Sequence, residues 1–586
     1  MNRYDTYYDS LERSYRIIRS EERLSIEASI EELCKLLMLK LCFEHENKSQ
    51  FQPFIYDGEA SHEPVSSFYK RYFNKYVPSY EFAGWETQML SKNTYWKVCE
   101  ELTTMSFAEI DPEVHGAMFT AFLQKHYSGY LSEYSSPKKL NLFIMDVLGA
   151  EKTSSIADPC CGIGGTLVEA ASRTKGTVQL KGFDINVRMA NTARLHLMMY
   201  GYKEDAIECQ DMLKEAKVYV MDQYDYVIAH LPQIHQAFSV AGRRETQRQY
   251  PFRDYEDCFI SQILKMLKPD GMAAIVVSDE LIESDKRSGS RRWLYENAKV
   301  LNITKFEGLA YETGGAARTY NVIFLKHNHY DASDVCSSAF ISKDVEDGDI
   351  NQIAVSINEE IHGLTSGGKC DAIKYFRLLD RNNWNVTLLY LQEKIGVNYP
   401  VVPLRELMYH KKDRINIDSD GYYTQLTVRN KGLGVIRRGE PIKGGLLPKD
   451  ARYEVRSGQL IVSSLEATRG ALGIVPKELD RSVVTRNYYA FMIDTTRVRA
   501  DYLTLVLCTG PIMRQMSTLN KREYAMSRIT LEKMLSVVIP LPSLDEQDHL
   551  SKAMMKQVKK IQTAQEELES EQKNFCKELF GEWEIE

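Results

Sequence analysis

The stretch SSIADPCCGIGGTLVEAA, residues 154–171, decides the fold class of this 586-residue chain. It combines a short apolar strand around Ile156, a tight loop containing Gly162, Gly164 and Gly165, and a helical pattern that follows. Glycines let a backbone approach a ligand closely, and the first turn of the following helix offers free N–H groups. Many nucleotide-binding sheets share this arrangement, so the stretch alone predicts an α/β sheet with a ligand loop but no particular ligand.

Short apolar strands and helical stretches alternate after this loop. Helical patterns run through Glu169 and Met199, and the strand patterns are VQLKGFDIN (178–186), DYVIAH (225–230) and MAAIVVSD (272–279). This alternation predicts a parallel α/β sheet with helices on both faces.

Three acidic residues follow successive strands of this predicted sheet. Asp158 precedes the glycine loop, and Asp184 ends the next strand, where a carboxylate can accept both hydroxyls of a ribose. Asp211, in CQDML, ends the strand after that, where it can hold an adenine amine. The three positions favour a nucleoside-containing ligand.

The rest of the chain predicts four further segments around a sheet domain at residues 116–330. Residues 1–115 are expected to be helical, because Ile26, Ile30, Leu33, Leu37 and Leu41 have the spacing of one helix face. Residues 331–395 are expected to be a connecting region, and 396–545 a β-rich domain. Residues 546–586 are expected to form a long amphipathic helix, with apolar side chains at Leu550, Met554, Val558, Ile561, Leu568, Phe575 and Leu579.

Charge is distributed unevenly along the chain. The whole sequence carries a formal net charge of −7, whereas residues 401–530 contain 22 Lys and Arg against 13 Asp and Glu. A polyanion is the partner that such a basic segment fits, although a solvated basic surface would have the same composition.

Several classes of protein are excluded by composition. No segment approaches membrane-spanning length, and the charged N-terminus MNRYDTYYDSLERSYR differs from a secretory signal, so we expect a cytoplasmic protein with no membrane partner. Eleven cysteines without CxxC pairs or a Cys/His cluster indicate neither a disulfide framework nor a zinc site.

At five places the sequence resembles the modification subunit of type I restriction-modification systems, the adenine-N6 DNA methyltransferases. DPCCGIGGTLVEA matches that family's DPxCGxGGxLxEA loop, and SGYLSEYSSPKKLNLFIMDVL (128–148) resembles its cofactor-covering segment. Residues 258–282 and 301–328 resemble its later catalytic strands and helices, and residues 31–47 its helical N-terminal domain.

This resemblance implies a Rossmann-like class I methyltransferase domain that binds S-adenosylmethionine. The residues that it implies for the cofactor come from the covering segment, the glycine loop and the two following strand ends: Tyr134, Ser136, Pro137, Asp158, Cys161, Gly162, Gly164, Asp184 and Asp211.

The basic part of the chain resembles a different subunit. ITLEKMLSVVIPLPSLDEQDHLSKAM (529–554) is similar to the end of a target-recognition domain in type I specificity subunits, where a PLPxLxEQ turn leads into a spacer helix. The resemblance therefore implies a modification subunit fused to one domain that recognises double-stranded DNA. The candidate DNA contacts are Arg429, Lys431, Arg437, Arg438, Lys443, Arg469, Arg486, Lys521 and Arg522, while Tyr422, Tyr423, Tyr488 and Tyr489 are expected to pack in the core.

The tetrad His230-Leu231-Pro232-Gln233 stands where the resemblance places Asn-Pro-Pro-Phe. In that family the Asn oxygen and the next carbonyl accept hydrogen bonds from the N6 amine of a flipped adenine, and the aromatic ring stacks on the base. A neutral histidine can still accept, but Leu231 lacks the fixed φ of proline and Gln233 lacks the ring. Stacking is worth roughly 1–3 kcal/mol. The tetrad is therefore predicted to be a catalytic loop that has diverged.

Alternatives for His230 are a local hydrogen bond within the loop, or a metal site with His235. No carboxylate or cysteine completes a ligand set there, so no metal is predicted.

The sequence thus predicts a sequence-specific DNA-binding protein that binds S-adenosylmethionine, with doubtful methyl transfer, in phage defence, restriction-modification or regulation. The alternative is an active adenine-N6 methyltransferase in which His230 and the Leu231 carbonyl hold the amine. A methyltransferase for small molecules would leave the basic segment and the PLPSLDEQ turn unexplained.

Partners follow from the same features. Two copies of the chain paired through the C-terminal helix would give a two-part reader, but the same helix can equally pack within its own chain. No P-loop and no magnesium-nuclease pattern occurs in the sequence, so cleavage or translocation would need a separate protein.

Overall fold

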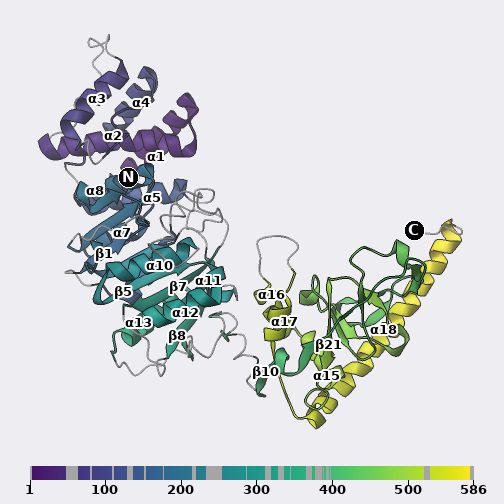
Figure 1. The fold of residues 1–586 in the computed structure, drawn as a ribbon. Helices are drawn as coiled ribbons and strands as arrows, with labels where there is room; N and C mark the ends of the chain where they lie inside the picture. The colour runs from purple at the N-terminus through teal and green to yellow at the C-terminus, as the bar shows by residue number, and fades with distance from the viewer. Residues whose placement is uncertain are drawn as a thin grey trace. The chain divides into compact units, whose positions relative to one another are not determined.

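The structure is a computed structural model. It describes residues 3–47, 64–78, 82–108, 111–127, 136–150, 154–175, 177–213, 220–231, 254–284, 287–309, 318–327, 335–342, 345–364, 373–376, 384, 386, 389–390, 395, 398–520 and 528–580. The chain divides into two compact units, Met1–Val386 and Thr387–Glu586, which Figure 1 shows in purple to teal and in green to yellow. Each unit has its own apolar cores.

The first unit begins with helices. Before its first strand the described residues form α1 (Arg3–Glu22), α2 (Ile26–Asn47), α3 (Val65–Tyr76), α4 (Lys92–Leu102), α5 (Pro112–His126) and α6 (Lys138–Leu148). Ile30, Leu33, Leu37 and Leu41 of α2 are buried as predicted, but Leu36, Met38 and Leu39 on its other sides are buried too. The reason is that α2 packs against α1, α3 and α8 (Val187–Met199) at once, so it is a central helix and not a surface one.

A nine-stranded sheet follows in the order β3-β2-β1-β4-β5-β7-β6-β8-β9. The strands are β1 (Ser155–Asp158), β2 (Gln179–Asp184), β3 (Ile207–Cys209), β4 (Tyr224–His230), β5 (Leu267–Val277), β6 (Lys299–Leu309), β7 (Arg318–Lys326), β8 (Cys336–Ile341) and β9 (Ile373–Phe376). Strands β3, β2, β1, β4 and β5 run parallel, and β7 lies antiparallel between β5 and β6. The predicted α/β class with a mostly parallel sheet is confirmed.

Helices connect and cover these strands. They are α7 (Gly165–Arg173), α8, α10 (Tyr255–Met266), α11 (Asp279–Glu283), α12 (Ser288–Asn297) and α13 (Asp347–Ile361). In Figure 1, α10 lies across the strands, and it packs on β4 and β5. The side chains of α6, α7 and α13 share one core with the sheet.

Strands β8 and β9 belong to the sheet, although the sequence suggested a connecting region at 331–395. Strand β8 pairs parallel with β6, and β9 pairs antiparallel with β8. The isoleucines of α13, including Ile353 and Ile357, are buried in the core of the sheet. Short strands of four to six residues give a weak sequence signal, which explains the difference.

The second unit is built from short strands and a few helices. Its main sheet has the order β11-β21-β18-β19, and a second sheet has the order β12-β17-β20. These strands are β11 (Met408–His410), β12 (Asp413–Arg414), β17 (Tyr453–Glu454), β18 (Leu460–Ser463), β19 (Leu472–Ile474), β20 (Val483–Val484) and β21 (Tyr488–Ile493). Two-stranded pairs are made by β10 (Val401–Pro403) with β22 (Val538–Pro540), β13 (Tyr422–Tyr423) with β16 (Ile442–Lys443), and β14 (Leu426–Val428) with β15 (Val435–Arg437).

Three helices of the second unit, α15 (Ala500–Leu507), α16 (Gly510–Leu519) and α17 (Leu531–Ser536), complete its larger core. Tyr422 was expected in the core, but it is 68% exposed. The expectation was wrong because β13 has two residues and, among the described strands, pairs with β16 alone, which leaves the Tyr422 side chain without a second layer.

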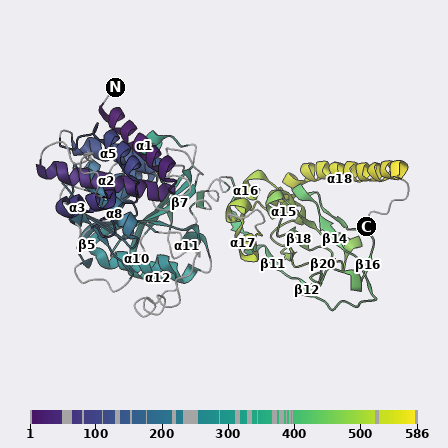
Figure 2. The ribbon, with the colours of Figure 1, turned by 90° about the horizontal axis from the view of Figure 1, so that it is seen from above.

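The last helix, α18 (Leu544–Phe580), runs along one side of the second unit in both views (Figures 1 and 2). Val558 is buried against the unit, and Gln562 Nε2 donates to the Leu433 carbonyl at 3.1 Å. The other apolar side chains of the predicted stripe are 48–62% exposed: Leu550, Met554, Ile561, Leu568, Phe575 and Leu579. The helix therefore packs within its own chain by one face and exposes an apolar stripe on another. None of the described helices is long and apolar enough to cross a membrane.

Candidate functional site

Four polar side chains stand at the same edge of the sheet in the first unit. Strands β3, β2, β1 and β4 are neighbours in this order and run parallel, so their carboxyl ends meet at one edge. Asp184, Asp158 and His230 are the last residues of β2, β1 and β4, and Asp211 lies two residues after β3. The carboxyl edge of a parallel sheet is where α/β proteins bind ligands, which makes this edge the candidate site.

The loop after β1 is shaped by its glycines. Gly162 has φ +54° and Gly164 has φ +82°, a left-handed conformation that favours glycine. Gly164 caps the start of α7, and its N–H donates to the Cys161 carbonyl at 2.8 Å. A Cβ on Gly164 would lie 3.3 Å from Ala193 Cβ on α8. The loop consequently passes close to α8. At Gly162 and Gly164 no side chain covers the loop's own backbone.

Asp184 fixes this loop from the neighbouring strand. Its Oδ2 accepts from the Gly162 N–H at 2.9 Å and its Oδ1 from the Asn186 N–H at 2.8 Å, while the Cys161 N–H donates to the Phe183 carbonyl at 2.9 Å. The carboxylate is thereby oriented by backbone groups, and each oxygen retains a second lone pair for a ligand.

Both carboxylates next to the loop have raised pKa values. Burial, and after it the charge of Asp184, raises the pKa of Asp158 to about 7, although the Cys160 N–H donates to Asp158 Oδ1 at 3.0 Å. Burial also raises the pKa of Asp184. A ligand with a positive charge would favour the ionised form of both groups.

Two groups that the sequence analysis did not identify support the site. His196 on α8 lies beneath the loop and its Nδ1 donates to the Ile163 carbonyl at 2.9 Å, with its pKa lowered to about 4 by burial. Ile185, directly after Asp184, is 70% exposed. The signal for Ile185 was available in the sequence, because an apolar residue interrupts the polar turn after Asp184, whereas the role of His196 depends on tertiary packing.

The remaining predicted cofactor residues are placed as follows. Asp211 Oδ1 accepts from the Leu213 N–H at 3.0 Å, and Ser136 and Pro137 are buried just before α6. A Cβ on Gly165 would lie 3.4 Å from Ser136 Oγ, so this serine packs against the start of α7. Tyr134 lies outside the described residues.

His230 ends β4 beside the glycine loop. The Cys160 thiol donates to the His230 carbonyl at 3.4 Å. Although the residue as a whole is half-buried, Nε2 of its ring is buried, and no described residue lies within hydrogen-bonding distance of it. Burial lowers the pKa of His230 to about 4, so the ring is neutral at pH 7.

Leu231 is tied to the neighbouring strand. Its side chain is buried and its N–H donates to the Val276 carbonyl of β5 at 3.2 Å. A proline at this position has no N–H and could not make this bond, so the local backbone is held here by a hydrogen bond and not by a ring. Pro232, Gln233 and His235 lie outside the described residues.

The predicted DNA contacts of the second unit fall on several turns and strand ends. Lys431 and Arg469 are brought together, because the Gly432 N–H donates to the Gly470 carbonyl at 2.8 Å and joins their two turns. Four of the predicted contacts are exposed next to a carboxylate: Arg437 with Glu440, Lys443 with Asp420, Arg469 with Glu466, and Arg486 with Asp450. Arg438 is exposed, and Lys521 and Arg522 lie outside the described residues.

Arg429 differs from this group. Its Nη2 donates to both carboxylate oxygens of Glu569 on α18, at 2.9 and 3.0 Å, and its side chain is only 13% exposed. The structure thus shows Arg429 attaching α18 to the loop that follows β14.

Part of the first unit is similar to known proteins. Residues 111–358 match the family model described as N-6 DNA Methylase. The methylase subunit of the type I restriction enzyme EcoKI from Escherichia coli (strain K12) is 23% identical over 331 residues, which cover 50% of this chain and 62% of that protein. The methylase subunit of MjaVII from Methanocaldococcus jannaschii is 32% identical over 139 residues, which cover 22% of this chain and 23% of that protein.

This chain therefore matches less than two thirds of the length of these two relatives. Among solved structures, the methyltransferase subunit of a type I restriction-modification system from Streptococcus thermophilus superposes with a TM-score of 0.50 at 15% identity, covering 66% of this chain and 99% of that one. The similarity in structure confirms the predicted Rossmann-like class I methyltransferase fold.

Proposed function

We propose, because residues 111–358 match the N-6 DNA methylase family model, that this chain binds S-adenosylmethionine and DNA but transfers methyl groups weakly or not at all. In this proposal residues 396–545 are a target-recognition domain, and the protein acts in phage defence, restriction-modification or regulation. The proposal rests on one combination of features. The glycine loop after β1 keeps the family's cofactor motif, whereas the end of β4, at His230, departs from the family's catalytic motif.

The residues present fit S-adenosylmethionine. Asp184 is positioned to accept from ribose hydroxyls, Asp158 is suited to the positively charged methionine end, and Asp211 to the adenine amine. The exposed Ile185 offers an apolar surface for the adenine ring. When bound, the cofactor supplies a methyl group on a sulfonium; the chain's own residues bind and orient it.

At the position of the target base, this chain has fewer groups that could hold an adenine than the type I modification subunits have. The catalytic Asn-Pro-Pro-Phe of that family is replaced by residues 230–233, and the Leu231 N–H bond to Val276 has no equivalent when a proline stands there. Since methyl transfer depends mainly on positioning the amine and the base, loss of the amide and of the stacking ring weakens catalysis.

A second candidate function, an active adenine-N6 methyltransferase, is favoured by one observation. The buried Nε2 of His230 has no partner among the described residues, and its lowered pKa leaves the ring neutral, so it can accept one hydrogen bond from an amine.

The experiment that tests the proposal compares cofactor and DNA binding in the natural protein and in Asp184→Ala. Calorimetry should detect S-adenosylmethionine binding that Asp184→Ala weakens at least tenfold, while DNA retention in a mobility-shift assay stays unchanged. If the natural protein binds neither ligand, the proposal is wrong. The variant His230→Asn, assayed for methyl transfer, separates the two candidate functions, because restored transfer would locate the deficit at this residue.

We also propose that a second copy of the chain covers the exposed stripe of α18. Met554, Ile561, Leu568 and Phe575 recur every seven residues, the spacing of a coiled-coil seam, and an identical helix presents an identical stripe. Native mass measurement should give a dimer that Ile561→Glu/Leu568→Glu converts to a monomer, whereas a natural protein that is monomeric at micromolar concentration would refute the pairing.

In this proposal, cleavage or translocation of DNA requires a separate nuclease or translocase.

A further inference from the structure

A second set of basic side chains in the second unit surrounds the turn Thr485–Asn487, between β20 and β21. Lys412 approaches the turn from the segment that links β11 to β12, and Arg528 approaches it from the segment before α17. Arg486 stands in the turn itself. Neither Lys412 nor Arg528 was among the DNA contacts predicted from the sequence.

Lys412 is a half-buried cation without a carboxylate partner in the part of the chain that the structure describes. Its Nζ donates to the Tyr488 carbonyl at 2.6 Å and to the Thr485 carbonyl at 3.3 Å, and it lies 4.0 Å from the centre of the Tyr453 ring. These are neutral partners, which leave the positive charge uncompensated. Burial, followed by the charge of Arg528, lowers the pKa of Lys412 to about 8.

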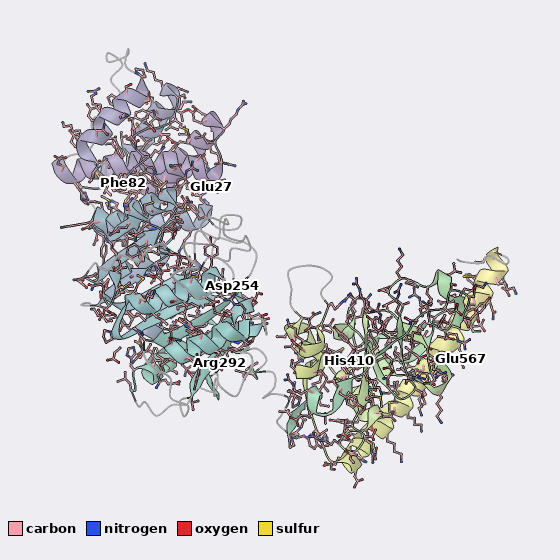
Figure 3. The ribbon with its side chains drawn as sticks, viewed as in Figure 1. Glu27, Phe82, Asp254, Arg292, His410 and Glu567 are labelled. Carbon is pink, nitrogen blue, oxygen red and sulfur yellow. The ribbon has the colours of Figure 1, made fainter. Side chains whose placement is uncertain are left out.

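Arg528 is exposed, and its Nη2 donates to Asn487 Oδ1. No described carboxylate lies within ion-pair distance of it, and Arg486 has only Asp450, at 4.0 Å. His410, two residues before Lys412 on β11 and labelled in Figure 3, adds no charge at neutral pH, because burial and Lys412 lower its pKa. The cations therefore face the turn with little negative charge to balance them.

The turn that they surround is held in place by hydrogen bonds. The Asn487 N–H donates to Thr485 Oγ1 at 3.3 Å, and the Asn487 carbonyl accepts from the Ser464 N–H at 2.8 Å. The Ile529 N–H donates to the Ser464 carbonyl at 2.9 Å, which fixes Arg528 next to the turn. Preorganised cations lose little freedom when an anion binds between them.

This arrangement differs from that of six other basic side chains of the unit. Arg437, Lys443, Arg456, Arg469, Arg497 and Arg499 each have a carboxylate within 4.0 Å. Those pairs satisfy their charge inside the protein, whereas Lys412 and Arg528 require an anion from outside to do so.

We propose that Lys412, Arg528 and the Thr485–Asn487 turn form a binding site for a backbone phosphate of DNA. The inference rests on the proposed DNA binding and adds to it a defined contact. The cations donate to the phosphate oxygens, and the Thr485 hydroxyl is a further donor at the same place. Because a phosphate carries no sequence information, this contact fixes the position of the DNA and does not select the site.

The test is the salt dependence of DNA binding, measured with full-length protein and two duplexes of different sequence. The double variant Lys412→Gln/Arg528→Gln should reduce the slope of log Kobs against log salt by about 0.9, the value for one phosphate. Arg528→Lys, which keeps the charge, should retain the natural slope. Lys477→Gln, an exposed lysine after β19 at the other edge of the main sheet, serves as the control and should leave the slope unchanged.

Since Lys412 also holds two carbonyls, Arg528→Gln alone is measured beside the double variant. Its side chain is exposed, so its thermal midpoint should equal that of the natural protein while DNA binding weakens equally on both duplexes. If both the single and the double variant gave the same slope of log Kobs against log salt as the natural protein, the phosphate site would be overturned, but the proposed function would not be affected. Weakening on one duplex only would also overturn it, because it would indicate base reading. A natural protein that binds neither duplex at any salt concentration would overturn the proposed function itself.

Discussion

The substitution Gly164→Ala tests whether the loop after β1 is a ligand-binding loop whose shape depends on its glycines. Gly164 has φ +82°, and an added Cβ would lie 3.3 Å from Ala193 Cβ and 3.5 Å from Ala193 Cα on α8. The left-handed backbone costs roughly 1–2 kcal/mol for an alanine. Crowding against the backbone of a packed helix adds about 1 kcal/mol or more.

Gly84→Ala is a matched control in the same unit. Gly84 has φ +85°, and its Cβ would meet nothing within 4 Å, so this variant has the backbone cost alone. We expect Gly84→Ala to lower the stability of the first unit by about 1–2 kcal/mol and Gly164→Ala by about 2–4 kcal/mol. The difference between the two isolates the contact with α8.

The assay combines thermal unfolding with calorimetric titration of S-adenosylmethionine. Gly164→Ala should weaken cofactor binding at least tenfold, about 1.4 kcal/mol, because the loop shifts away from α8, whereas Gly84→Ala should leave the affinity within twofold. Equal losses of stability in the two variants, with unchanged cofactor affinity in both, would refute the role assigned to the loop.

Two further predictions concern charge. Asp158, with a pKa of about 7, is largely protonated below that pH, and a cationic ligand favours its ionised form, so S-adenosylmethionine affinity should rise by up to about tenfold per pH unit between about pH 5.5 and about pH 7. Asp158→Asn should abolish this dependence, and an affinity that stays constant in the natural protein would contradict it. For α18, Arg429→Ala should increase hydrogen exchange around Gln562 and Glu569, with a coupling to Glu569→Ala of about 1 kcal/mol or less, since Glu569 is largely exposed. Weaker DNA binding with unchanged exchange in α18 would instead make Arg429 a DNA contact.

The sheet and the carboxyl edge of its first four strands could be predicted because their signals are local. The glycine loop, Asp158 and Asp184 lie within 27 residues of sequence, and the alternation of strand and helix patterns predicts that the strands run parallel. These features place the acidic residues and His230 at one edge without any knowledge of distant contacts.

Other features depend on contacts between residues far apart in the sequence. The ion pair of Arg429 with Glu569 joins positions 140 residues apart, and the bond from Leu231 to Val276 exists only because β5 lies beside β4. Strands β8 and β9 were missed since each is short and its pairing depends on β6. Lys412 and Arg528 are separated by more than one hundred residues, so no sequence pattern could bring them together.

The α2 helix shows a limit of periodicity itself. Its predicted apolar face is buried, but Lys35 and Lys40 on the same helix are buried as well, paired with Glu32 and Glu44. A pattern of apolar positions identifies the helix, whereas its central place in the bundle depends on what packs around it.

The most direct test of the central claim is transfer of labelled methyl from S-adenosylmethionine to mixed genomic DNA by the natural protein. Cofactor and DNA binding are measured in the same preparation. The account predicts that both ligands bind and that label incorporation stays at the level of a control with no protein, because residues 230–233 no longer position the base. Incorporation by the natural protein that His230→Ala abolishes would contradict the account and make His230 a catalytic residue.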